Sequence, residues 1–159
     1  MKKLYIIILL LTSLLFNQDR SIIFNTGSPD PLNDGYIIDT NHSVANRIMI
    51  ANDYVLEAMV FYMRAENVEA SNVKVSIRED NNGIPGNLVS ELSQWEHPID
   101  ILHPSNYNLI VTTDLCIYLD AGNYYWWTIE AADESTEASW IHSNSPFYNI
   151  ATSDNGGIT

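Results

Sequence analysis

A strand pattern that ends in a compact Asn/Gly/Pro segment constrains the fold of this chain more than any other feature. Apolar and polar residues alternate over Val73–Ile77, which is the period-two pattern of a strand with one buried and one wet side. The segment DNNGIPG at 80–86 then stops the strand. Asn82-Gly83 tolerates positive φ angles and Pro85-Gly86 favours a second reversal, so we expect the chain to turn twice here.

Similar short strand patterns continue along the chain, at spacings of about 8–15 residues, with turn residues between them. They cover Asn46–Ala51, Tyr54–Arg64, Val73–Glu79, Leu88–Trp95, Tyr107–Val111, Asp114–Leu119, Asn123–Ala131, Ala138–His142 and Phe147–Ala151. No convincing amphipathic helix follows Phe16. Short strands without helices predict an all-β fold, specifically an antiparallel β-sandwich.

Two details refine this prediction. Residues 21–40 are rich in turn-forming types and hold a short strand at most, near Tyr36–Ile38. Asn52-Asp53 is a hairpin signal between two candidate strands. Tyr54–Arg64 is apolar on both faces, which predicts a strand that is central in its sheet or covered on its outer side.

The segment SIREDNNGIPG at 76–86, taken with LDAGNYYWWTIE at 119–130, resembles the choice-of-anchor R family of bacterial surface-protein domains. It is also similar to other jelly-roll accessory modules, and the resemblance runs from Val44 to Trp140. It implies a jelly-roll-like sandwich in an exported bacterial protein, with no catalytic residue to carry over. The family pattern continues into a closing strand where this chain stops at Thr159, so we expect the final strand to be missing.

The N-terminus predicts export. Lys2 and Lys3 precede the apolar run Leu4–Phe16, which is the size of a signal-peptide core and too short for a typical membrane span. We therefore expect a signal helix at 1–18, a leader at 19–43 and the sandwich domain at 44–159, with Sec-type export to the cell surface or medium. No Ala-x-Ala motif marks the cleavage site, so an uncleaved anchor is the alternative.

The chain is strongly acidic, with a formal net charge of −13. Nucleic acids and anionic membranes attract clustered Lys and Arg, so this charge argues against both as partners. Polysaccharides, cell-envelope proteins and metal ions stay open as partners. The simpler interpretation is that the acidic residues keep an exported protein soluble.

Catalytic motifs are missing from the sequence. The four histidines lack the spacing of a metal pair, and no Gly-x-Ser-x-Gly elbow occurs. Cys116, in LCIYL, is the only cysteine and is expected to be a packed strand thiol. Asp80 and Asn82 are weak candidates for a Ca²⁺ site, but both residue types also form turns. We expect no enzymatic activity.

Aromatic side chains give the sharpest functional hypothesis. Alternation along Asn123–Ala131 places Tyr124 and Trp126 on the face that also carries Thr128 and Glu130, which we expect to be exposed. Such rings could stack against sugars, with Trp140 and Tyr148 extending the surface. Alternatively, a loop or the leader covers the rings as a second core layer. Exposed rings would favour a carbohydrate-binding module, and buried rings a structural or adhesive module.

Overall fold

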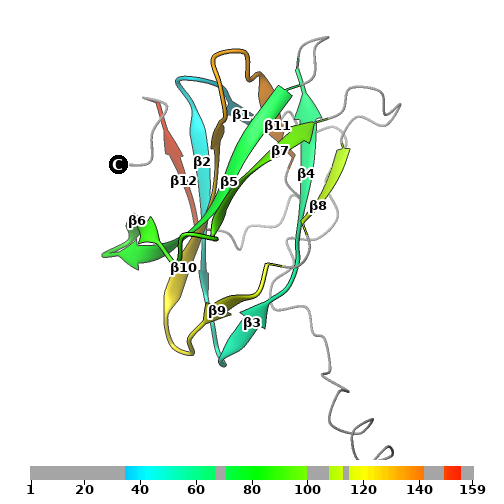
Figure 1. The fold of residues 1–159 in the computed structure, drawn as a ribbon. Coiled ribbons are helices and arrows are strands. Elements are labelled where there is room, and N and C mark those ends of the chain that lie inside the picture. Colours follow the sequence, from blue (N-terminus) through cyan, green and yellow to red (C-terminus); the bar gives the residue numbers. More distant parts are fainter. Residues whose placement is uncertain (1–34, 67–70, 100–107, 113–114, 142–148, 155–159) are drawn as a thin grey trace, which may run out of the picture.

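The computed structural model describes residues 35–66, 71–99, 108–112, 115–141 and 149–154, and all the regular structure in these residues is β. Figure 1 shows the strands in chain order. They are β1 (Tyr36–Ile38), β2 (Ser43–Met49), β3 (Tyr54–Leu56), β4 (Met59–Ala65), β5 (Ser71–Asn81), β6 (Ile84–Leu88), β7 (Gln94–Ile99), β8 (Asn108–Thr112), β9 (Ile117–Leu119), β10 (Tyr124–Ala131), β11 (Ala138–Trp140) and β12 (Asn149–Ser153).

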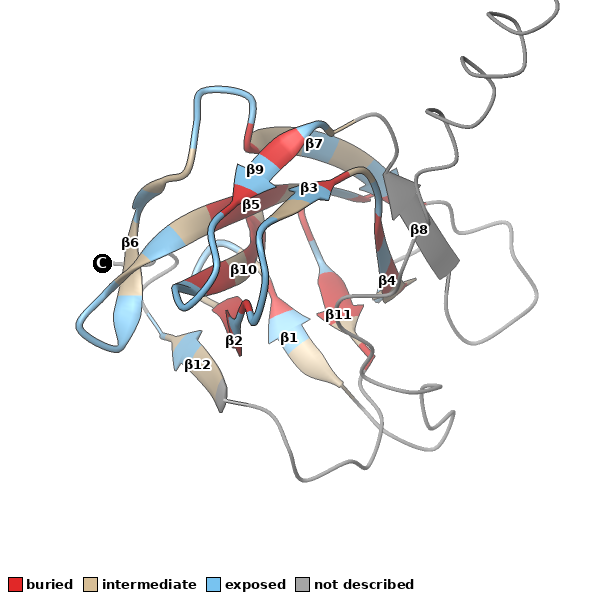
Figure 2. Cartoon of the chain, turned by 90° about the horizontal axis from the view of Figure 1, so that it is seen from below, coloured by how far each residue is buried: buried red, intermediate tan, exposed pale blue. Residues whose placement is uncertain are grey.

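Two antiparallel sheets lie against each other (Figures 1 and 2). One has the strand order β1-β11-β4-β8; the other has the order β12-β2-β10-β5-β6, and β7 also pairs with β5. The expected all-β, antiparallel, sandwich-like fold is therefore confirmed. The core between the sheets is built from the alternate apolar residues of each strand, such as Val73, Val75 and Ile77, all 0% exposed.

The longest predicted strand is divided into two strands. Tyr54–Arg64 is split into β3, which pairs with β9, and β4, which pairs with β8. Two residues, 57–58, separate β3 from β4, whereas four residues, 113–116, separate β8 from β9. As expected, β4 is central in its sheet, between β11 and β8.

Two predictions near this division are wrong. Cys116 is exposed, with a φ of 47°, because β9 begins only at the next residue and the left-handed backbone precedes the strand. Asn52-Asp53 does not close a hairpin, because β2 pairs with β10 and β12 while β3 pairs with β9. The segment instead leads the chain from β2, in the six-stranded sheet, to β3, in the separate pair β3-β9.

The Asn/Gly turn has the expected local geometry, but the second reversal does not occur. Asn82 (φ 56°) and Gly83 (φ 91°) join β5 to β6, as in the two-residue hairpins that need positive φ at both positions. Pro85 and Gly86 lie inside β6. The register between β5 and β6 shifts between Arg78 and Asp80.

The predicted strand Leu88–Trp95 is also wrong. β6 ends at Leu88 and β7 begins at Gln94. Between them, the buried hydroxyl of Ser93 hydrogen-bonds the carbonyl oxygens of Ser90 and Ile77. These bonds fold the residues between β6 and β7 into a compact turn. The side-chain pattern of Leu88–Trp95 is that of a strand, so it does not predict this turn.

Most predictions for the two ends of the chain concern residues that are not described. These are the signal segment 1–18 and the C-terminal residues 155–159. The predicted short strand near Tyr36–Ile38 is present as β1. No helix in the described ranges is long and apolar enough to cross a membrane. The predicted loss of a closing strand stays a prediction.

Candidate functional site

The outer face of the six-stranded sheet is not the aromatic platform that the sequence predicts. Tyr124 is 42% exposed, but Trp126 is only 3% exposed, and Thr128 and Glu130 on the same face are 0% and 6% exposed. Strand alternation is correct, because Tyr125 and Ile129 are in the core on the other side. The inference that polar neighbours make the outer face wet is wrong.

The carboxylate of Asp80 bonds the buried Trp126 to neighbouring parts of the sheet. The indole N–H of Trp126 donates to Asp80 Oδ1 at 2.7 Å, and Arg47 donates from Nε and Nη2 to the two carboxylate oxygens at 2.8 Å each. The backbone N–H of Gly83 donates to Oδ2 at 3.2 Å. One carboxylate thus joins the hairpin tip to β2 and β10.

A second polar group closes the same face further along β10. Glu130 accepts from Lys74 at 3.0 Å and from Arg78 at 3.5 Å. Between these ion pairs, the hydroxyl groups of Ser76 and Thr128 lie 2.5 Å apart. Buried polar groups are tolerated when they are hydrogen-bonded, which is how polar residues come to lie on a covered face.

Tyr124 is the one predicted platform ring that the structure shows as exposed. The guanidinium carbon of Arg47 lies 3.9 Å from the centroid of its ring, within range of a cation–π contact. Trp140 is half-buried in β11 of the other sheet and makes an edge-to-face contact with Phe61, with centroids 5.6 Å apart. Tyr148 lies outside the described residues. The described rings do not form one surface.

Asp80 and Asn82, the weak candidates for a Ca²⁺ site, are engaged in hydrogen bonds. Asp80 accepts from Arg47, Trp126 and Gly83, and these donors fill the roughly four acceptor positions of a carboxylate. The amide nitrogen of Asn82 lies 3.3 Å from Asn81 Oδ1. In the described part of the chain, no three His, Cys, Asp or Glu side chains group closely enough to hold a metal ion.

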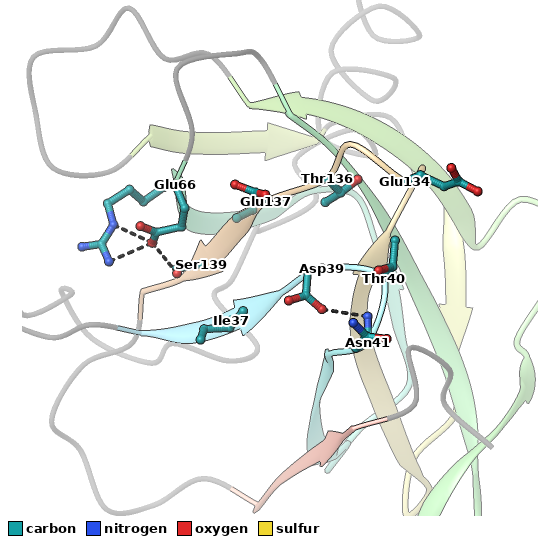
Figure 3. A pocket seen from close by; sticks show the side chains of 11 residues that line it. Ile37, Asp39, Thr40, Asn41, Glu66, Glu134, Thr136, Glu137 and Ser139 are labelled. Atoms are coloured by element: carbon teal, nitrogen blue, oxygen red, sulfur yellow. Dashed lines mark hydrogen bonds and ion pairs between the residues drawn. The ribbon is translucent and has the colours of Figure 1, made fainter.

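A polar pocket lies on the other side of the molecule, against the outer face of the four-stranded sheet. Its volume is about 670 Å³, within the usual range for small-ligand sites. Figure 3 shows it between the segment after β1 and the segment that leads from β10 into β11. The lining residues are Ile37, Asp39, Thr40, Asn41, Arg64, Glu66, Glu134, Thr136, Glu137, Ala138 and Ser139.

Two carboxylates of the pocket are held by neighbours. Glu66 forms an ion pair with Arg64 at 2.8 Å and accepts a hydrogen bond from the hydroxyl of buried Ser139 (Figure 3). Asp39 accepts from the backbone N–H of Asn41 at 2.7 Å and lies 2.8 Å from His42 Nδ1. Partial burial by itself raises the pKa of Asp39, but these hydrogen bonds outweigh it and hold the pKa below its usual value.

The other two carboxylates are open. Glu134 and Glu137 are exposed, and no described residue donates to either side chain. Their backbone is nevertheless fixed: buried Thr136 donates to the carbonyl of Asn72 at 2.7 Å, and Ser71 donates to the carbonyl of Glu137 at 3.1 Å. The pocket therefore presents polar groups on a rigid frame.

Sequence reasoning missed this pocket. It placed Asp39–Asn41 in the leader at 19–43 and assigned no site to the segment Asp133–Glu137. The two segments are about 95 residues apart, and they meet because β1 pairs with β11, with Ile37 opposite Ser139. The clustering of polar residues in both loops was visible in the sequence, but no local pattern shows that β1 joins β11.

Comparison with known proteins gives no relative that assigns a function. No family model matches the chain, and none of the curated proteins matches it.

Proposed function

We propose that this chain is a non-catalytic β-sandwich module of an exported bacterial protein and that it binds carbohydrate in the pocket on the four-stranded sheet. The export component rests on the N-terminal sequence, and the resemblance to choice-of-anchor R domains is in keeping with it. The observation that carries the binding component is the pocket, because its lining combines open hydrogen-bonding groups with a fixed backbone.

The pocket chemistry suits a neutral, hydroxyl-rich ligand. Glu134 and Glu137 can accept hydrogen bonds from sugar hydroxyls, and Asn41 can both donate and accept. Ile37, which is 57% exposed and lines the pocket, offers an apolar surface to the C–H groups of a sugar ring. Four acidic residues against the single arginine in the lining disfavour anionic sugars.

The same lining favours binding over catalysis. Ser139, a hydroxyl in the lining, is 1% exposed and donates to Glu66. Its hydroxyl is thus covered and already used in a hydrogen bond to a carboxylate that also pairs with Arg64, and is not presented to a ligand as a nucleophile. The proposal assigns no reaction to the pocket.

A glycan-array screen of the exported chain, followed by calorimetric titration of the sugars it retains, tests the proposal. Glu137→Gln keeps the shape of the side chain and removes its charge, and Ile37→Ser removes the apolar contact. Both variants are expected to weaken binding at least several-fold with unchanged folding. Glu91→Gln, on the exposed turn before β7, is the matched control and is expected to bind like the wild type.

A structural or adhesive module of the cell envelope is the second candidate. The observation that favours it is the buried Trp126–Asp80 contact, because the aromatic residues of β10 hold the sheet together instead of facing a ligand. A folded protein that retains no sugar on the array would support this candidate and contradict the first.

A further inference from the structure

The β3-β9 pair has one buried and one exposed face. Leu56, Ile117 and Leu119 are at most 5% exposed and belong to the core. Val55 and Tyr118 lie opposite each other on the other face and are 38% and 75% exposed. No other described aromatic side chain is as exposed as Tyr118. Figure 1 shows this strand pair at the lower end of the view, whereas β1 and β11, which border the pocket, lie toward the upper end.

The backbone beside this exposed pair is fixed by hydrogen bonds. Where β9 ends, the N–H of Asp120 donates to the hydroxyl of buried Tyr125 at 2.9 Å. The N–H of Ala121 donates to Asp53 Oδ1 at 2.7 Å, which joins the end of β9 to the start of β3. A tyrosine on a fixed backbone offers a large contact area at a low cost in conformational entropy.

Two carboxylates border the exposed pair. Asp53 directly precedes β3 and Asp120 directly follows β9. Each is two residues from Val55 or Tyr118, roughly 6–7 Å along a strand. Both aspartates are exposed. In the described part of the chain, the N–H of Ala121 is the one donor to Asp53, and no residue donates to the carboxylate of Asp120.

The described cationic side chains are used elsewhere in the molecule. The described ranges contain four lysine or arginine residues, and each forms an ion pair with an acid away from β3 and β9. These pairs are Arg47 with Asp80, Arg64 with Glu66, and both Lys74 and Arg78 with Glu130. The described cations therefore leave the charge of Asp53 and Asp120 to a partner. The net charge of −13 also attracts cationic partners over a long range.

We infer that Asp53, Val55, Tyr118 and Asp120 form a docking face for a lysine- or arginine-rich segment of a partner protein. The aliphatic stem of a long cationic side chain packs on Val55, and its charged head lies over the ring of Tyr118 and beside the two carboxylates. Because the face is acidic and has no described internal counter-charge, its charge complements such a segment.

The exposure of Tyr118 favours a protein segment over a small molecule as the occupant. Small ligands bind in concave pockets that enclose them, and a ring that is 75% exposed encloses nothing. Exposed tyrosine is instead enriched at protein interfaces. None of the four residues lines the pocket on the four-stranded sheet, so the docking face is independent of the proposed carbohydrate site.

An NMR titration of the isotopically labelled exported chain with a synthetic peptide of alternating lysine and alanine tests this inference. Shift changes that saturate are expected at residues 53–56 and 117–121. Tyr118→Ser is expected to weaken binding several-fold, whereas Tyr118→Phe, which keeps the ring, is expected to bind like the wild type. A peptide of alternating glutamate and alanine is expected to leave these residues unshifted.

Matched removal of a carboxylate distinguishes the docking face from general attraction to an acidic protein. Asp120→Asn is expected to weaken binding several-fold. Its control is Asp154→Asn, at an exposed position after Ser153, which pairs with the first residue of β2. This control is expected to bind like the wild type. Equal weakening by the two variants, or shifts spread over acids throughout the chain, would overturn the inference. Spermine that binds at the same residues as tightly as the peptide would reject a protein segment as the occupant.

Discussion

On the outer face of the six-stranded sheet, Asp80 binds Arg47 and Trp126, and Glu130 binds Lys74 and Arg78. Against the outer face of the four-stranded sheet, polar groups of similar chemistry are only partly paired, so that Glu134 and Glu137 stay open. The first surface uses its polar groups to hold strands together. The second leaves two exposed carboxylates, Glu134 and Glu137, without a described partner.

This difference shows that residue type alone does not tell whether the polar groups of a surface are paired inside the protein. The first surface holds the residues that a sequence reader associates with ligands, two adjacent aromatic side chains and nearby acids. Their hydrogen-bonding groups already have partners within the protein. What distinguishes the pocket is the combination of a fixed backbone with donors and acceptors that have no described partner.

The largest expected effect comes from Trp126→Ala. A ring that is 3% exposed leaves a cavity when it is truncated, and we expect a loss of about 3–5 kcal/mol in the free energy of unfolding. Tyr124→Ala removes a ring that is 42% exposed and is expected to cost clearly less. Denaturant unfolding of both variants measures the difference. Equal losses would mean that the two rings do not differ in burial.

Asp80→Ala is expected to have the next largest effect. It leaves the donors of Arg47 and Trp126 without their acceptor, at a cost of about 1–3 kcal/mol. Denaturant unfolding at neutral pH measures it. A double-mutant cycle with Arg47→Met should give a favourable coupling energy between the two side chains, whereas additive losses would separate Arg47 from the contact.

The Asp80 contribution should also depend on pH. Partial burial raises the pKa of Asp80, but hydrogen bonds from Arg47, Trp126 and Gly83 outweigh it and hold the pKa below its usual value near 3.8. A lowered pKa in the folded state stabilises the protein above the unfolded pKa, and this stability is lost as the pH falls through the folded pKa. The stability gap between wild type and Asp80→Asn should therefore be full at neutral pH and shrink in acid. A gap that widens in acid would contradict this.

Gly83→Val tests the turn that positions Asp80. Its φ of 91° strains any residue with a Cβ, although no other atom lies within 4 Å of the added carbon. We expect a loss of about 1 kcal/mol or more, from backbone strain alone. Thermal melts compare it with Asn81→Ala, at an exposed neighbour with an ordinary strand backbone. Unchanged melting of Gly83→Val would mean that the turn relaxes.

The smallest stability effect is expected in the pocket. Glu137→Gln should stay within about 0.5 kcal/mol of the wild type, since the side chain is exposed and has no described partner. Glu66→Gln should cost more, because Glu66 binds Arg64 and Ser139. Denaturant unfolding of both variants measures the difference in stability between the paired carboxylate of Glu66 and the open one of Glu137. A larger loss of stability from Glu137→Gln than from Glu66→Gln would contradict the assignment of Glu137 as the open carboxylate.

The sequence predicted the elements that depend on local pattern. Alternation located β5 and β10, and Asn82-Gly83 located the hairpin, because side-chain periodicity and positive φ are properties of a few neighbouring residues. The sequence did not predict the partners of β2 and β3, since a strand sequence says little about which strand it joins. The late start of β9, which leaves Cys116 exposed before the strand, was missed for the same reason.

The candidate site was predicted less well than the fold. Exposure of Trp126 was inferred from its polar neighbours on β10. That inference fails because Thr128 and Glu130 find partners, Ser76 and Lys74, on a strand about 50 residues away. The pocket depends on the pairing of β1 with β11, which lie even further apart in sequence. Both surfaces are created by contacts that no local pattern contains.

Hydrogen exchange of the Trp126 indole N–H, followed by NMR in the native protein, tests the central claim most directly. The claim is that the outer face of the six-stranded sheet is closed by its own hydrogen bonds. It predicts an indole proton that exchanges far more slowly than that of an exposed tryptophan, and that Asp80→Asn accelerates its exchange. An indole proton in the wild type that exchanges as fast as a solvent-exposed one would contradict the account.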